Sequence, residues 1–183
     1  MLANFPSTGE TFNVHKQLLY DNSSLFAEFF REMGPNQLIT LKGENPNSFK
    51  LFITYLYSEQ VPGVPVNANV IAQATRLKDL CQLYTMGEKY TFTPKFLNKV
   101  IDRIQDGFAI TRKVPEPPLI QNIYKHTKNK ASKLREFCVA CVLFYLRSKD
   151  CEYSILAIVL LSSSQALLYL VSLLPNAYWH FSF

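Results

Sequence analysis

The sequence has few of the residues that form catalytic, redox or phosphate-binding sites. It contains four cysteines and six glycines in 183 residues, and its three histidines are scattered. Four cysteines are too few for the disulfide framework of a small secreted domain. The serine-hydrolase G-x-S-x-G motif, the Gly-rich nucleotide-binding loop and the zinc-binding H-E-x-x-H motif are absent. We therefore expect a protein that is not an enzyme and needs no metal and no cofactor.

Charge and targeting signals are also weak. The net charge is +5, from 19 Lys and Arg against 14 Asp and Glu, whereas nucleic-acid-binding proteins usually show a concentrated basic face. The first ten residues have neither the basic nor the apolar region of a secretory signal. Hydrophobic residues make up 48% of the chain, which excludes general disorder. We expect an intracellular globular protein in the cytoplasm, the nucleus or both.

Hydrophobic spacing and capping residues predict an α+β chain that is mostly helical. Asn45 and Thr93 are expected to cap helices, because each precedes a proline that suits the first helical turn. We expect strands at about 11–14 and 38–41, and helices at about 16–22, 24–32, from 46, 68–89, from 94, from 119 and 132–147.

A proline-rich segment at 113–118 predicts the internal boundary of the chain. We expect a domain over 1–108, a linker over 109–118, further helices over 119–151 and an apolar tail over 152–183. No Asp, Glu, Lys or Arg follows Glu152. Residues 155–174 could cross a bilayer as a helix, although a Ser-Ser-Ser-Gln cluster interrupts them. A membrane anchor, a helix packed on 134–147 and an atypical terminus with exposed apolar surface all remain open for this tail.

Two residue clusters have simple structural explanations. Cys138 and Cys141 have the C-x-x-C spacing of redox and zinc sites, but both lie on the apolar stripe of a predicted helix, and no second pair accompanies them. We interpret them as core cysteines. The basic run from Lys125 to Arg135 is interpreted as a solvated helix face, and no nucleic-acid partner is expected.

Three segments of the sequence resemble the BTB/POZ family in its fungal form, and together with the helices that follow they span about 10–147. They are FNVHKQLL at 12–19 with SLF at 24–26 and FF at 29–30, then ITL at 39–41 with Phe49, Phe52 and YLY at 55–57, and finally LYTMGEKY at 83–90 with NKVID at 98–102. The resemblance implies a non-enzymatic protein-interaction module, in which short helices flank a small sheet and extra helices follow. It is commonly homodimeric. Many relatives are adaptors for cullin-based ubiquitin ligases, and others recruit transcriptional regulators.

The resemblance also implies candidate contact residues. The family's His-Lys pair begins the first helix and contributes to the dimer surface, and His15 and Lys16 match it. Leu18 and Leu19 follow on the same helix and complete this candidate surface. A solvated helix start is the alternative for His15 and Lys16.

A second candidate contact concerns cullin binding. Cullin-binding relatives often carry a hydrophobic-x-Glu triplet after the second helix, which makes Phe30 and Glu32 candidate cullin contacts. The family's sheet also has a strand ahead of Phe12. Because only about ten residues precede Phe12 here, including Pro6 and Gly9, we expect that strand to be missing and the sheet to have an exposed edge.

Overall fold

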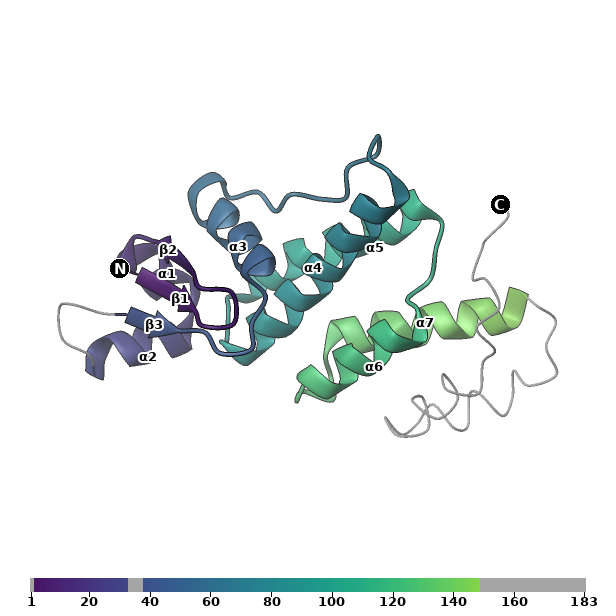
Figure 1. Cartoon of the computed structure of the whole chain (residues 1–183). Helices are drawn as coiled ribbons and strands as arrows, with labels where there is room; N and C mark the ends of the chain where they lie inside the picture. The colour runs from purple at the N-terminus through teal and green to yellow at the C-terminus, as the bar shows by residue number, and fades with distance from the viewer. Residues whose placement is uncertain (1, 33–37, 149–183) are drawn as a thin grey trace. The chain divides into compact units, whose positions relative to one another are not determined.

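The structure is a computed structural model that describes residues 2–32 and 38–148 (Figure 1). The chain divides into two compact units, Met1–Gly107 and Phe108–Phe183. The predictions for the tail at 152–183, including the possible membrane anchor at 155–174, lie outside the described residues. In the part of the chain that is described, no helix is both long and apolar enough to cross a bilayer.

A three-stranded sheet opens the first unit. Strand β1 (Leu2–Phe5) pairs antiparallel with β2 (Glu10–Asn13) and parallel with β3 (Leu38–Thr40), which gives the order β2-β1-β3. The expectation of a missing first strand is therefore wrong. Residues 6–9 form a tight turn, in which Gly9 has a φ of +70° and donates its N–H to the carbonyl of Phe5. The Pro6 and Gly9 that suggested an irregular start thus connect two strands.

Helices α1–α4 lie in the first unit and α5 begins in it, and all five are close to their predicted positions. They are α1 (Lys16–Asn22), α2 (Ser24–Glu32), α3 (Pro46–Ser58), α4 (Val70–Lys89) and α5 (Pro94–Thr111). Ser23 separates α1 from α2 because its hydroxyl donates to the carbonyl of Tyr90 and accepts from the amide of Phe26. Asn45 caps α3 as predicted, since its side-chain oxygen accepts from the amide of Asn47 at 2.9 Å.

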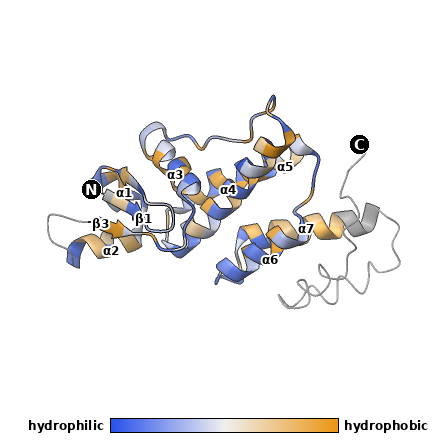
Figure 2. Ribbon diagram, viewed as in Figure 1, coloured by the Kyte–Doolittle hydropathy of each residue, from blue (hydrophilic) through white to orange (hydrophobic). Residues whose placement is uncertain are grey.

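Aromatic rings fill the core of the first unit. Phe52 of α3 is fully buried and stacks on Phe92, with ring centroids 4.0 Å apart, and Phe96 of α5 packs against both. Figure 2 shows hydrophobic and hydrophilic residues alternating around the helices, as expected for helices with one buried face. The aromatic core therefore holds the helices in fixed positions beside the sheet.

The second unit contains α6 (Pro117–His126) and α7 (Lys133–Ser148). Arg135 fixes the turn between them, because its guanidinium lies over the Tyr124 ring and donates to the Tyr124 carbonyl at 3.0 Å. Helix α5 extends to Thr111 and α6 begins at Pro117, so the non-helical connection is shorter than the expected linker at 109–118. A proline in the first turn costs a helix nothing, and Pro117 and Pro118 belong to α6 rather than to the linker.

Candidate partner-binding surface

His15 lies at the start of α1 and is held by a residue from α3. Its Nδ1 atom shares a hydrogen bond with the Tyr57 hydroxyl at 2.6 Å, and its backbone N–H donates to the same hydroxyl at 3.3 Å. The two rings meet edge to face, and 53% of Tyr57 is exposed. Sequence reasoning gave Tyr57 no role, although it belongs to the YLY segment that carries the resemblance.

The other predicted contact residues on α1 differ in exposure. Lys16 is exposed, with its ammonium 5.1 Å from the centroid of the Phe30 ring, and Leu18 is half-buried. Leu19 has no exposed area. Its assignment to a partner surface is therefore corrected: Leu19 is on the face of α1 that packs into the core.

The predicted cullin-contact pair is also divided. Phe30 is 5% exposed and stacks on Phe26, one helical turn earlier on the inner face of α2. Phe30 is therefore a core residue, which corrects its assignment as a contact. Glu32 is exposed. The exposed apolar side chain on α2 is Phe29, at 37%, which lies three residues before Glu32 and hence on the same side of the helix.

Large apolar side chains of the first unit are exposed in two sets. The first set, which we call the aromatic set, consists of Tyr20 of α1 and Tyr57 of α3, and Phe29 of α2 and Leu38 of β3 are exposed as well. The second set, the α4 apolar set, consists of Val66, Val70 and Ile71 around the start of α4. Monomeric proteins tolerate single exposed apolar residues, but gathered ones indicate interaction sites.

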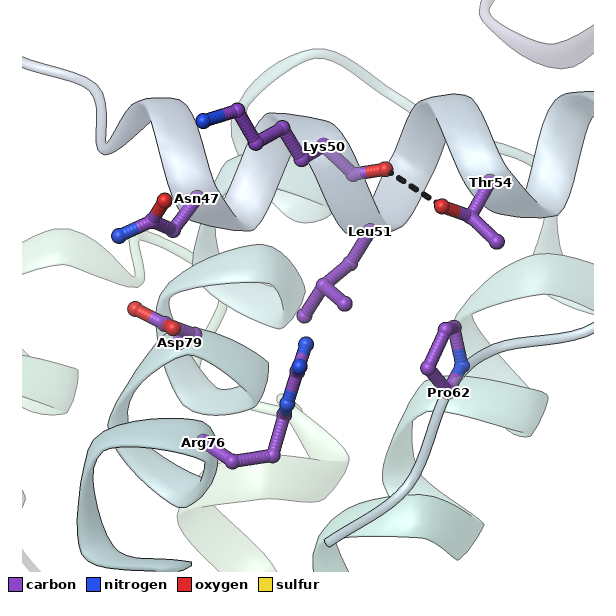
Figure 3. Close-up of a pocket in the computed structure, with 7 residues that line it drawn as sticks. All are labelled: Asn47, Lys50, Leu51, Thr54, Pro62, Arg76 and Asp79. Carbon is purple, nitrogen blue, oxygen red and sulfur yellow. Dashed lines mark hydrogen bonds between the residues drawn. The ribbon is translucent and has the colours of Figure 1, made fainter. Parts of the chain in front are cut away.

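A hollow of about 260 Å³ lies between α3, α4 and the segment that follows α3 (Figure 3). Its lining residues are Asn47, Lys50, Leu51, Thr54, Pro62, Arg76 and Asp79. Burial raises the pKa of Asp79, while the amide of Asn45, which donates to this carboxylate at 2.8 Å, lowers it. The hollow is thus lined by both charges and by apolar side chains.

The described cysteines have the properties of core residues. Cys81 and Cys138 are buried and Cys141 is partly buried, and burial raises the pKa of the Cys81 and Cys141 thiols to about 12. Within residues 2–32 and 38–148, no three His, Cys, Asp or Glu side chains gather closely enough to hold a metal ion. The features that the structure offers for recognition are therefore the two exposed apolar sets and the hollow.

Comparison with protein families accounts for this arrangement. Residues 5–92 match the family model of the BTB/POZ domain, from the end of β1 through α4. The chain contains a BTB/POZ domain. BTB/POZ domains are protein-interaction modules, and the family is not an enzyme family. A comparison with curated proteins found no match. Membership of the fungal form stays a prediction, because the BTB/POZ match does not distinguish it.

Proposed function

We propose that this BTB/POZ domain forms a homodimer through α1 and the aromatic set, and that the protein is an adaptor in a cullin-based ubiquitin ligase or a transcriptional complex. The observation that carries the proposal is the exposure of Tyr20, on the helix that begins after His15, and of Tyr57, whose hydroxyl is hydrogen-bonded to His15. A cytoplasmic or nuclear location stays a prediction.

The aromatic set has the chemistry of an interface centre. Tyrosines contribute a large apolar contact area together with a hydroxyl that needs a partner when it is buried. The Tyr20 hydroxyl accepts a hydrogen bond from Arg31, and the Tyr57 hydroxyl is bonded to His15. Each of the two hydroxyls therefore already has one hydrogen-bond partner within the chain. His15 and Lys16 supply polar groups for the rim of such an interface.

For a cullin contact, we propose Phe29 and Glu32 in place of the predicted Phe30 and Glu32. Both side chains are exposed, and they are three residues apart on α2. This pair offers one apolar and one acidic group to a partner. Changing Phe29 also leaves the core intact, because the buried position is Phe30.

Sedimentation equilibrium of the full chain tests the dimer. We expect a dimer for the wild type and a monomer for the double variant Tyr20→Glu/Tyr57→Glu. The matched control is Val70→Glu/Ile71→Glu, which places the same charges on exposed apolar residues of α4 and should remain dimeric. A monomeric wild type at high micromolar concentration, or equal loss of the dimer in both variants, would contradict the proposal.

A pull-down with a purified cullin amino-terminal domain tests the adaptor role. Wild type and the α4 control should bind, whereas Phe29→Glu and Glu32→Lys should each lose binding and keep a wild-type circular dichroism spectrum. If the wild type does not bind the cullin, the cullin role is wrong. The transcriptional complex is then the remaining adaptor role. Binding by both α2 variants at the wild-type level would overturn the assignment of Phe29 and Glu32.

A further inference from the structure

The hollow between α3 and α4 is too small for a cofactor but has room for a side chain. Pockets for drug-sized ligands usually enclose roughly 300–1,000 Å³, and this one encloses about 260 Å³. Its apolar lining comes from Leu51 and Pro62, and its polar lining from side chains of α3 and α4. A single protein side chain with an apolar stem and a polar end fits this combination.

Arg76 is the charged lining residue of the hollow that forms no hydrogen bond or ion pair with a described residue. Figure 3 shows its side chain extending from α4 toward Leu51. Arg76 is half-buried, and its guanidinium has no hydrogen bond or ion pair with any described residue. A guanidinium carries five N–H donors in a planar fork that matches a carboxylate. Partial burial without an acceptor leaves these donors available for a ligand.

The other two charged side chains of the lining already have partners. The ammonium of Lys50 forms an ion pair with Glu10 at 3.0 Å, and the carboxylate of Asp79 accepts from the amide of Asn45. Figure 3 shows the end of Lys50 directed away from Arg76. Arg76 and Lys78 both act electrostatically on Asp79 and favour its charged form. Two positive side chains, Arg76 and Lys78, therefore act on the single negative charge of Asp79.

We propose that this hollow binds an acidic side chain, Asp or Glu, from a protein partner. Arg76 holds the carboxylate through two parallel N–H···O bonds. The side-chain amide of Asn47, which also lines the hollow, has no hydrogen bond to any described residue. Leu51 and Pro62 contact the aliphatic part of the ligand. The inference rests on the proposed function as an interaction module and adds a contact site separate from the aromatic set.

A peptide titration of the full chain, followed by NMR of the arginine side-chain Nε–H signals, tests the site. The probe is the blocked peptide acetyl-Leu-Glu-Leu-Gly-amide, and its Gln counterpart is the neutral control. The Arg76 signal, assigned with Arg76→Lys, should shift and saturate with the Glu peptide. The Gln peptide should bind at least about tenfold more weakly, because it loses the charge-assisted bonds.

Two variants separate a specific site from a general charge effect. Arg76→Gln should abolish the saturable shifts of backbone amides around the hollow. Lys42→Gln removes one positive charge from an exposed position of the same unit and should bind the Glu peptide as the wild type does. Equal binding of the Gln peptide, wild-type binding by Arg76→Gln, or no saturable shift of Arg76 would each overturn the proposal.

The same variant distinguishes failure of this site from failure of the proposed function. Arg76→Gln should sediment as a dimer, because Arg76 is not part of the aromatic set. A wild type that is monomeric but binds the Glu peptide would remove the dimer and keep the acidic-side-chain site. A dimeric wild type without peptide binding would remove the site and keep the dimer.

Discussion

The Nδ1 atom of His15 lies 2.6 Å from the hydroxyl oxygen of Tyr57, 42 residues further along the chain. This contact ties the start of α1 to the carboxyl-terminal end of α3. Both residues are exposed, so a partner that covers one of them meets the other. The contact therefore belongs to the surface through which we expect the domain to dimerise.

Tyr57→Phe removes the hydroxyl and should destabilise the domain by about 0.5–1 kcal/mol, the usual net contribution of one hydrogen bond. A double-mutant cycle with His15→Ala, measured by urea unfolding, isolates the interaction between the two side chains. We expect a coupling energy of about 0.5 kcal/mol. Strictly additive effects of the two substitutions would show that the contact contributes nothing in solution.

Phe52→Ala should destabilise the first unit by about 3–5 kcal/mol, because it opens a cavity beside the stacked Phe92 ring. The matched control is Phe29→Ala on the exposed side of α2, for which we expect a loss of less than about 1 kcal/mol. Urea unfolding followed by circular dichroism gives both values. Similar losses at the two positions would contradict the assignment of Phe52 to the core.

The Asp79 carboxyl should make a pH-dependent contribution to stability. Burial raises its pKa in the folded state, so its contribution is full below the unfolded pKa of about 3.9 and is lost as the pH rises through the folded pKa. Asp79→Asn should therefore gain stability relative to the wild type as the pH rises from acid to neutral. Urea unfolding across this range measures the difference. Asp102→Asn, on the exposed side of α5, is the control, and its stability relative to the wild type should change less with pH. A stability of Asp79→Asn that falls relative to the wild type as the pH rises would contradict the prediction.

Cys81, Cys138 and the partly buried Cys141 should resist alkylation in the folded protein. A thiol whose pKa is about 12, as for Cys81 and Cys141, is almost entirely protonated at pH 8, and the thiolate is the reactive form. We expect iodoacetamide at pH 8 to leave Cys81, Cys138 and Cys141 largely unmodified, and to modify all three in urea. Peptide mass spectrometry reads each site separately. Rapid modification of Cys141 in the native protein would instead indicate an activated thiol.

Most helices could be predicted because their ends are encoded by local chemistry. Ser23 breaks the first helical pattern and Asn45 caps α3, and both signals depend only on neighbouring residues. Strand β1 could not be predicted because Pro6 and Gly9, which follow it within four residues, suggest an irregular segment. Its pairing with β3, more than thirty residues away, is not a local property. The sequence therefore predicted the fold class better than the extent of the sheet.

The candidate surface was harder to predict than the fold. Leu19 and Phe30 occur in the segments that resemble the family, but a sequence match does not tell which side of a short helix faces the core. Tyr57 and Arg76 depend on contacts between distant elements: Tyr57 on a bond to His15, and Arg76 on the hollow that α3 forms beside α4. No spacing in the sequence brings such pairs together.

Photo-crosslinking of the full chain tests the central claim, self-association through the aromatic set, most directly. Tyr20 is replaced by p-benzoylphenylalanine, and Val70 is replaced in the same way as the control. We predict a crosslinked species of twice the chain mass from position 20, at the expense of the monomer, and none from position 70. A crosslinked dimer from position 70 alone, or from neither position, would contradict the account.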